Sequence, residues 1–163
     1  MSTNVRRWFD LPRLLHNYER RMPLVLVNGL AEQAESWFAC AIAFAPSIPF
    51  AYADWGQMLL ASRDYDGAIA KFAVASQKGP HFADPLEMWG EALMLQNRSD
   101  LALAKFEEAD KYAPNWGRLH LERGEALWWS GDKPAARQQF AATSRLELSA
   151  MDRQALARAS SWH

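Results

Sequence analysis

The sequence repeats itself at an interval of 34 residues over most of its length. Glycine recurs at that interval, at Gly56, Gly90 and Gly124. Each glycine is followed by an alanine and then by a phenylalanine at constant spacing; these residues are Ala68, Ala102 and Ala136, and Phe72, Phe106 and Phe140. An interval of this size is typical of repeat proteins, in which one unit cannot bury its apolar face alone and must stack on its neighbours. The chain is therefore expected to fold as a series of similar stacked units.

The repeated unit resembles the tetratricopeptide repeat (TPR), a helix–turn–helix with the pattern W-x2-L-G-x2-Y, then A-x3-F, then P. The A-x3-F half is present in three copies, and Pro80 and Pro114 occupy the final position in two of them. In the front half the residues before the glycine differ from the family's Trp and Leu: they are Tyr52 and Trp55, Leu86 and Trp89, and His120 and Arg123. The resemblance implies an all-α fold, a right-handed α-solenoid of stacked hairpins with N- and C-terminal capping helices.

The period also places the element boundaries within one expected domain, residues 1–163. We expect an N-terminal helix and a degenerate repeat over 10–48, repeats over 49–82, 83–116 and 117–150, and a capping helix over 150–163. First helices are expected near 51–62, 85–96 and 119–130, and second helices near 65–78, 99–112 and 133–146. The capping helix is expected to begin at the Ser149-x-x-Asp152 signature.

The start of the chain departs from the pattern. A turn is expected at Asn28-Gly29, followed by a helix over 31–45 that ends at Pro46. Before it, an amphipathic helix is expected from Asp10 to Pro23. Because terminal repeats are normally atypical, we favour a cap for this helix, with an acidic membrane surface as the alternative.

The small and aromatic residues of the repeat have a structural role. Glycine and alanine lack bulk, so the two helices of a unit can approach closely, and the phenylalanine is expected to fill the space between adjacent units. In the last repeat, Trp128 and Trp129 point about 100° apart on one helix. We expect one of them to pack under the capping helix and the other to stand in the groove; the alternative is that residues 150–163 cover both.

The composition excludes several classes of protein. A net charge of −1 argues against a basic nucleic-acid binder. A single cysteine, Cys40, excludes a disulfide framework, and we expect its thiol to be buried. No apolar run suits an export signal or a membrane span, so we expect a cytoplasmic protein without a membrane-spanning segment.

Catalytic and metal-binding signatures are absent from the sequence. The four histidines, at 16, 81, 120 and 163, have no second ligand at metal-binding spacing. There is no glycine-rich phosphate loop and no nucleophile elbow. We therefore expect no enzyme, no cofactor and no metal site, and a half-buried structural role for His120.

What remains is a surface for binding. In proteins that this one resembles, the first helices line a concave groove that binds a peptide or a partner helix. Carried over by position, the resemblance implies binding residues Gln57, Leu60, Asp84, Glu87, Glu91, Met94, Leu95, Arg118, Leu121, Glu125, Trp128 and Trp129. The Lys, Asn and Arg clamp by which some relatives hold a C-terminal carboxylate is not carried over, because Gln57, Glu87, Glu91 and Glu125 occupy the groove positions where it would be needed.

The charge of this region indicates the kind of partner. Between Ala83 and Glu125, nine acidic residues stand against five basic ones. Such a surface concentrates a cationic partner. We therefore expect a basic peptide or helix with one or two apolar anchors; the alternative is that the acids only solvate an exposed helix face. Two further hypotheses remain. The chain could associate with itself, as in a homodimer, or it could be the repeat segment of a larger signalling protein.

Overall fold

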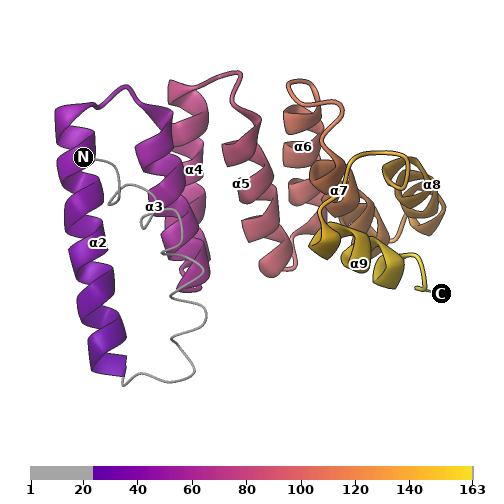
Figure 1. Ribbon diagram of the computed structural model, residues 1–163, viewed down its shortest axis with the longest axis horizontal. Helices are drawn as coiled ribbons and strands as arrows, with labels where there is room; N and C mark the ends of the chain where they lie inside the picture. Colours follow the sequence, from indigo (N-terminus) through magenta and orange to yellow (C-terminus); the bar gives the residue numbers. More distant parts are fainter. Residues whose placement is uncertain (1–23, 163) are drawn as a thin grey trace. The chain divides into compact units, whose positions relative to one another are not determined.

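The computed structural model describes residues 24–162, with side chains from Glu32 onward. The expected helix from Asp10 to Pro23 lies outside these residues. Within them the secondary structure is helical and contains no strand, as expected for an all-α fold (Figure 1). The helices are α2 (Leu24–Phe44), α3 (Pro49–Ala61), α4 (Tyr65–Lys78), α5 (Ala83–Leu95), α6 (Ser99–Asp110), α7 (Gly117–Ser130), α8 (Lys133–Thr143) and α9 (Ala150–Ala159).

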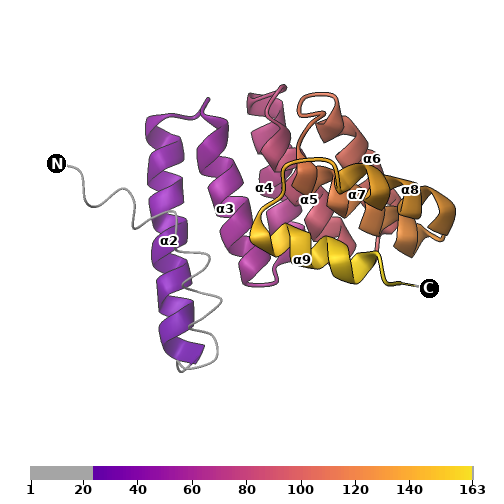
Figure 2. The ribbon, with the colours of Figure 1, turned by 45° about the vertical axis from the view of Figure 1, so that its right-hand side comes forward.

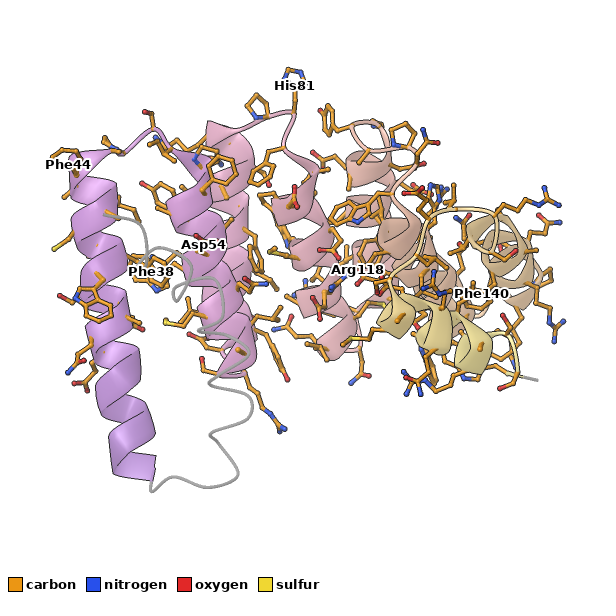
Figure 3. The ribbon with its side chains drawn as sticks, viewed as in Figure 1. Phe38, Phe44, Asp54, His81, Arg118 and Phe140 are labelled. Carbon is orange, nitrogen blue, oxygen red and sulfur yellow. The ribbon has the colours of Figure 1, made fainter. Side chains whose placement is uncertain are left out.

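The chain divides into two compact units, Met1–Gly79 and Pro80–His163. In the first unit, α3 and α4 form a helical hairpin and α2 packs against α3. The ring of Phe38 on α2 stacks on Trp55 of α3, with centroids 6.0 Å apart and planes 12° apart. Figure 3 shows Phe38 directed toward α3, whereas Phe44 at the end of α2 points away from it.

Helix α2 differs from its expected form. The turn predicted at Asn28-Gly29 is wrong, because α2 begins at Leu24 and continues through both residues. A glycine inside a helix costs only about 1 kcal/mol, which the helical hydrogen bonds on either side offset. Cys40 is exposed rather than buried, since α3 covers only part of this long helix.

The second unit contains two hairpins and a final helix. The α5–α6 hairpin packs through α6 on α7 of the α7–α8 hairpin, and α9 lies against α7 and α8 (Figure 2). The boundaries of α5 to α8 fall within three residues of those expected from the period, whereas α9 ends at Ala159 and not at 163. The prediction of a capping signature at Ser149 is confirmed, since its hydroxyl accepts a hydrogen bond from the Asp152 N–H and α9 follows.

Close packing of glycine against phenylalanine defines each hairpin. A methyl group placed on Gly56, Gly90 or Gly124 would lie within 3 Å of the ring of Phe72, Phe106 or Phe140, respectively. Each phenylalanine is buried. Each ring lies against the glycine of its own hairpin, so it holds the two helices of one repeat together. Phe140 also packs with Leu156 and Ala159 of the following helix, α9.

The turns inside the hairpins also follow the period. Arg63, Asn97 and Gly131 stand 34 residues apart, and all three have positive φ, at 66°, 59° and 100°. The left-handed conformation ends each first helix and turns the chain into the second. In two of the three turns an aspartate then caps the second helix: Asp64 accepts from the Gly67 N–H, and Asp132 from the Ala135 N–H.

The middle hairpin lacks this cap, which leads to a prediction. Arg98 is the N-cap residue of α6 and makes no capping hydrogen bond. Replacing Arg98 by Asp is expected to raise the free energy of unfolding by about 1 kcal/mol, because the new carboxylate accepts a hydrogen bond from the first turn. Urea denaturation checks this, with Arg98→Ala as the control; an equal gain in both variants would show that capping is not the cause.

None of the helices in residues 24–162 combines the length and apolar character that crossing a membrane requires.

Candidate functional site

The predicted binding residues are distributed over both units. Gln57 and Leu60 lie on α3 in the first unit, and both are half-buried. The other ten lie on α5 and α7 in the second unit. Five of these ten are at least partly accessible on neighbouring parts of α5 and the start of α7, and we call them the α5–α7 face: Asp84, Glu91, Met94, Leu95 and Arg118.

Arg118 is the central charge of the α5–α7 face. It extends from the first turn of α7 on the side facing α5 (Figure 3). Its Nε lies 2.6 Å from Glu87 Oε1 and donates to Glu122 Oε1 at 2.9 Å. Its Nη2 donates to Glu91 Oε2 at 3.3 Å. One guanidinium therefore joins carboxylates from both hairpins of the unit.

Glu87 does not stand in an open groove. Its side chain is only 2% exposed, so the prediction that it faces solvent is wrong. The first turn of α7 brings Arg118 over it, and a carboxylate is tolerated at this depth because a cation lies beside it. Glu87 therefore supports the surface from beneath and is not available to a partner in this conformation.

The electrostatics of the cluster favour protonated carboxyl groups. Burial raises the pKa of Glu87 to about 7; Arg118 opposes this shift, and Glu91 adds to it. Burial also raises the pKa of Glu122, and repulsion from Glu87 raises it further, whereas Arg118 lowers it. Burial lowers the pKa of Arg118, but the three carboxylates around it together outweigh this effect and raise that pKa, so its guanidinium stays charged.

Helix α9 covers the face of α7 on which Leu121 and Trp128 lie. Leu121 and Trp128 are buried in one apolar cluster with Phe140 of α8 and with Leu156 and Ala159 of α9. The prediction that Leu121 and Trp128 line an open groove is therefore wrong. The chain's own final helix, α9, covers them.

Glu125 is half-buried on the same side of α7. Burial raises the pKa of its carboxyl, and the nearby Arg158 on α9 lowers it. Its electrostatic partner thus comes from the same chain.

The two adjacent tryptophans behave as their spacing predicted. Trp128 packs under α9, with its ring centroid 5.5 Å from that of Trp162, whereas Trp129 is 64% exposed. The Trp129 ring nevertheless touches Trp162, at 5.6 Å between centroids. Trp129 is therefore an accessible aromatic side chain at the far end of this unit.

Sequence reasoning missed Glu122. It lies one helical turn after Arg118, and an arginine and a glutamate four residues apart on a helix form a pair. That local signal could have identified the contact with Arg118. The proximity of Glu122 to Glu87 on another helix had no signal in the sequence.

His120 has the structural role expected of it. The ring is half-buried; its Nε2 lies 2.8 Å from the Pro114 carbonyl oxygen and its Nδ1 lies 2.7 Å from the Gln139 side chain. Across the described part of the chain, no three His, Cys, Asp or Glu side chains are grouped so that they could hold a metal ion.

Comparisons with known proteins identify the fold. No family model matches the sequence, and no curated protein does. Three solved structures are similar to this chain. MamA is 17% identical, with a TM-score of 0.66, over 95% of this chain and 81% of its own. YrrB, described as a TPR protein with an unusual peptide-binding site, is 22% identical, with a TM-score of 0.62, over 85% of this chain and 66% of its own. TTC0263, a thermophilic TPR protein of Thermus thermophilus, is 17% identical, with a TM-score of 0.69, over 95% of this chain and 91% of its own. The resemblance to TPR proteins is thereby confirmed for the fold.

Proposed function

We propose that this chain, which has the fold of TPR proteins, is a non-catalytic interaction module that binds a basic peptide or helix on its α5–α7 face. The observation that carries the proposal is the combination of an exposed apolar side chain with acidic groups on this face. Leu95 is 50% exposed at the end of α5, and Glu91 lies one turn before it. An apolar anchor beside a charged group is the pattern by which helical grooves select amphipathic peptides.

The charges of the face favour a cationic partner. Arg118 meets three glutamates, so its positive charge is more than balanced within the cluster whenever at least two of them are ionised. Asp84, in the first turn of α5, adds a further carboxylate. Such a surface attracts lysine and arginine side chains and disfavours acidic partners. The surface suits a peptide whose lysine or arginine reaches Glu91 while an apolar residue packs on Leu95 and Met94.

Charge reversal at Glu91 tests this proposal. The probe is a labelled peptide that carries lysines and one leucine among serine and glycine residues. Changing Glu91 to Lys is expected to weaken binding at least about tenfold, because an attraction becomes a repulsion. The loss should shrink as salt is added.

The control is Glu107→Lys on α6, which makes the same change in charge on an exposed side chain whose pairing with Arg123 is weak. Equal binding by the Glu91 variant and the wild type would remove the proposal.

A second candidate function is self-association. Trp129 is exposed beside Trp162, and tryptophan is enriched at the centres of protein interfaces. In that case a second copy would cover this end of the second unit. Light scattering over a range of concentrations tests it, and a monomer at every concentration would exclude it.

A further inference from the structure

The geometry of the Arg118 cluster leaves two carboxyl oxygens, one on Glu87 and one on Glu122, without a hydrogen-bond donor among the described residues. Glu87 Oε1 and Glu122 Oε1 both approach the single Nε–H of Arg118, at 2.6 and 2.9 Å. That N–H donates to Glu122. Glu87 Oε1 is close, but it makes no hydrogen bond, and Glu122 Oε2 is also buried without a donor among the described residues.

A proton bound between Glu87 and Glu122 would supply the missing hydrogen-bond donor. Two buried carboxyl groups that face each other repel when both are ionised, and one proton between them turns the repulsion into a hydrogen bond. Glu87 and Glu122 are within hydrogen-bonding reach, and burial raises the pKa of each of them. The pair therefore gains and loses a proton near neutral pH.

Apart from those on α5, the charged groups on the surrounding elements interact with other partners. On α5, Glu91 acts on the pair and Asp84 lies one turn before Glu87. On α6, Lys105 pairs with Glu108, and Glu107 and Asp110 pair with Arg123. On α9, Arg158 acts on Glu125 of α7. Arg118 is consequently the cation whose position responds to the charge of the pair.

We propose that loss of the proton shared by Glu87 and Glu122 draws Arg118 inward and releases Glu91 to bind a lysine or arginine of the partner. With the proton present, the guanidinium is divided between the pair and Glu91. With both carboxylates ionised, their attraction for Arg118 increases, and its contact with Glu91, the longest of the three at 3.3 Å, is given up. This inference rests on the proposed function of the α5–α7 face, and it adds a control by pH.

This proposed pH control predicts that the affinity for the peptide depends on pH. If only the ionised pair exposes Glu91, the measured affinity scales with the ionised fraction. For a group with a pKa of about 7, that fraction rises from about 0.1 at about pH 6 to about 0.9 at about pH 8, so binding should strengthen about tenfold. An ordinary surface glutamate is already ionised throughout this range.

Fluorescence anisotropy with the labelled lysine–leucine peptide tests the inference at constant ionic strength, from about pH 6 to about pH 8. The peptide contains no histidine, so its own charge is constant. Wild type is expected to bind about tenfold more tightly at the upper pH, and Glu87→Gln is expected to lose this dependence. Glu122→Gln should lose it as well, which provides a second variant if the first folds poorly by circular dichroism. Glu107→Gln, on α6, is the control and should follow the wild type.

The outcomes separate the two proposals. The proposed pH control is overturned if the affinity of the wild type does not change with pH. It is also overturned if the Glu87→Gln and Glu122→Gln variants keep the full pH dependence. If Glu91→Gln binds the peptide as well as the wild type at every pH, the proposed function itself fails. If Glu91→Gln binds weakly while the other two variants keep the pH profile of the wild type, the pH control is overturned and the proposed function stands.

Discussion

Replacing Phe106 by Ala is expected to lower the free energy of unfolding of the second unit by about 3–5 kcal/mol. The ring is fully buried and lies against Gly90 of the preceding helix, where even a methyl group would not fit. Removing the ring leaves a cavity between α5 and α6, and Gly90 has no side chain that could fill it. Urea denaturation followed by tryptophan fluorescence measures the loss.

The matched control for this prediction is Leu101→Ala on the same helix. Leu101 is exposed, so its removal should change the stability by less than about 0.5 kcal/mol. Equal effects at the two positions would contradict the role assigned to the glycine–phenylalanine contact. The equivalent substitution of Phe72 should damage the first unit in the same way, because its ring meets Gly56.

The second large effect concerns pH. Glu87→Gln is expected to stabilise the protein by up to about 3 kcal/mol near pH 8, and to have little effect near pH 4.5. The pKa of Glu87 is raised in the folded state, so the folded protein holds a proton that the unfolded chain releases above pH 4.5. The stability that this carboxyl contributes is therefore lost as the pH rises from about 4.5 to about 7. Glutamine imitates the protonated form at every pH.

This prediction is checked by urea denaturation of wild type and variant across that range. The difference between the two proteins should grow with pH and level off above neutrality. Glu107→Gln, at a well-exposed position on α6, serves as the control and should show no such trend. A constant difference between wild type and Glu87→Gln would mean that Glu87 is ionised in the folded protein over the whole range.

The repeated elements were predictable because their causes are local. Small residues at fixed positions and a phenylalanine at another define a hairpin whose helices must approach closely, and the observed helices fall within three residues of the expected ones. The turn residues and the Ser149 cap depend on neighbours in the sequence. The same local geometry separated Trp128 from Trp129, since adjacent helical residues point in different directions.

The candidate site was less predictable because exposure depends on distant elements. Position in the repeat placed Glu87, Leu121 and Trp128 in an open groove, and all three are buried. Arg118 of the next repeat covers the first, and α9 covers the other two. A pattern along one helix shows which side chains share a face, but it does not show what lies on that face.

The sequence alone determined the fold class of this protein, the boundaries of its hairpin helices and the residues that hold each hairpin together, because these follow from contacts within one repeat. The tertiary structure decided which acidic groups remain accessible. It placed Glu87 and Glu122 from different helices against one guanidinium, and it left Glu91 at the surface. The physical reason is that desolvation and charge interactions depend on distance in space, which the order of residues along the chain does not contain.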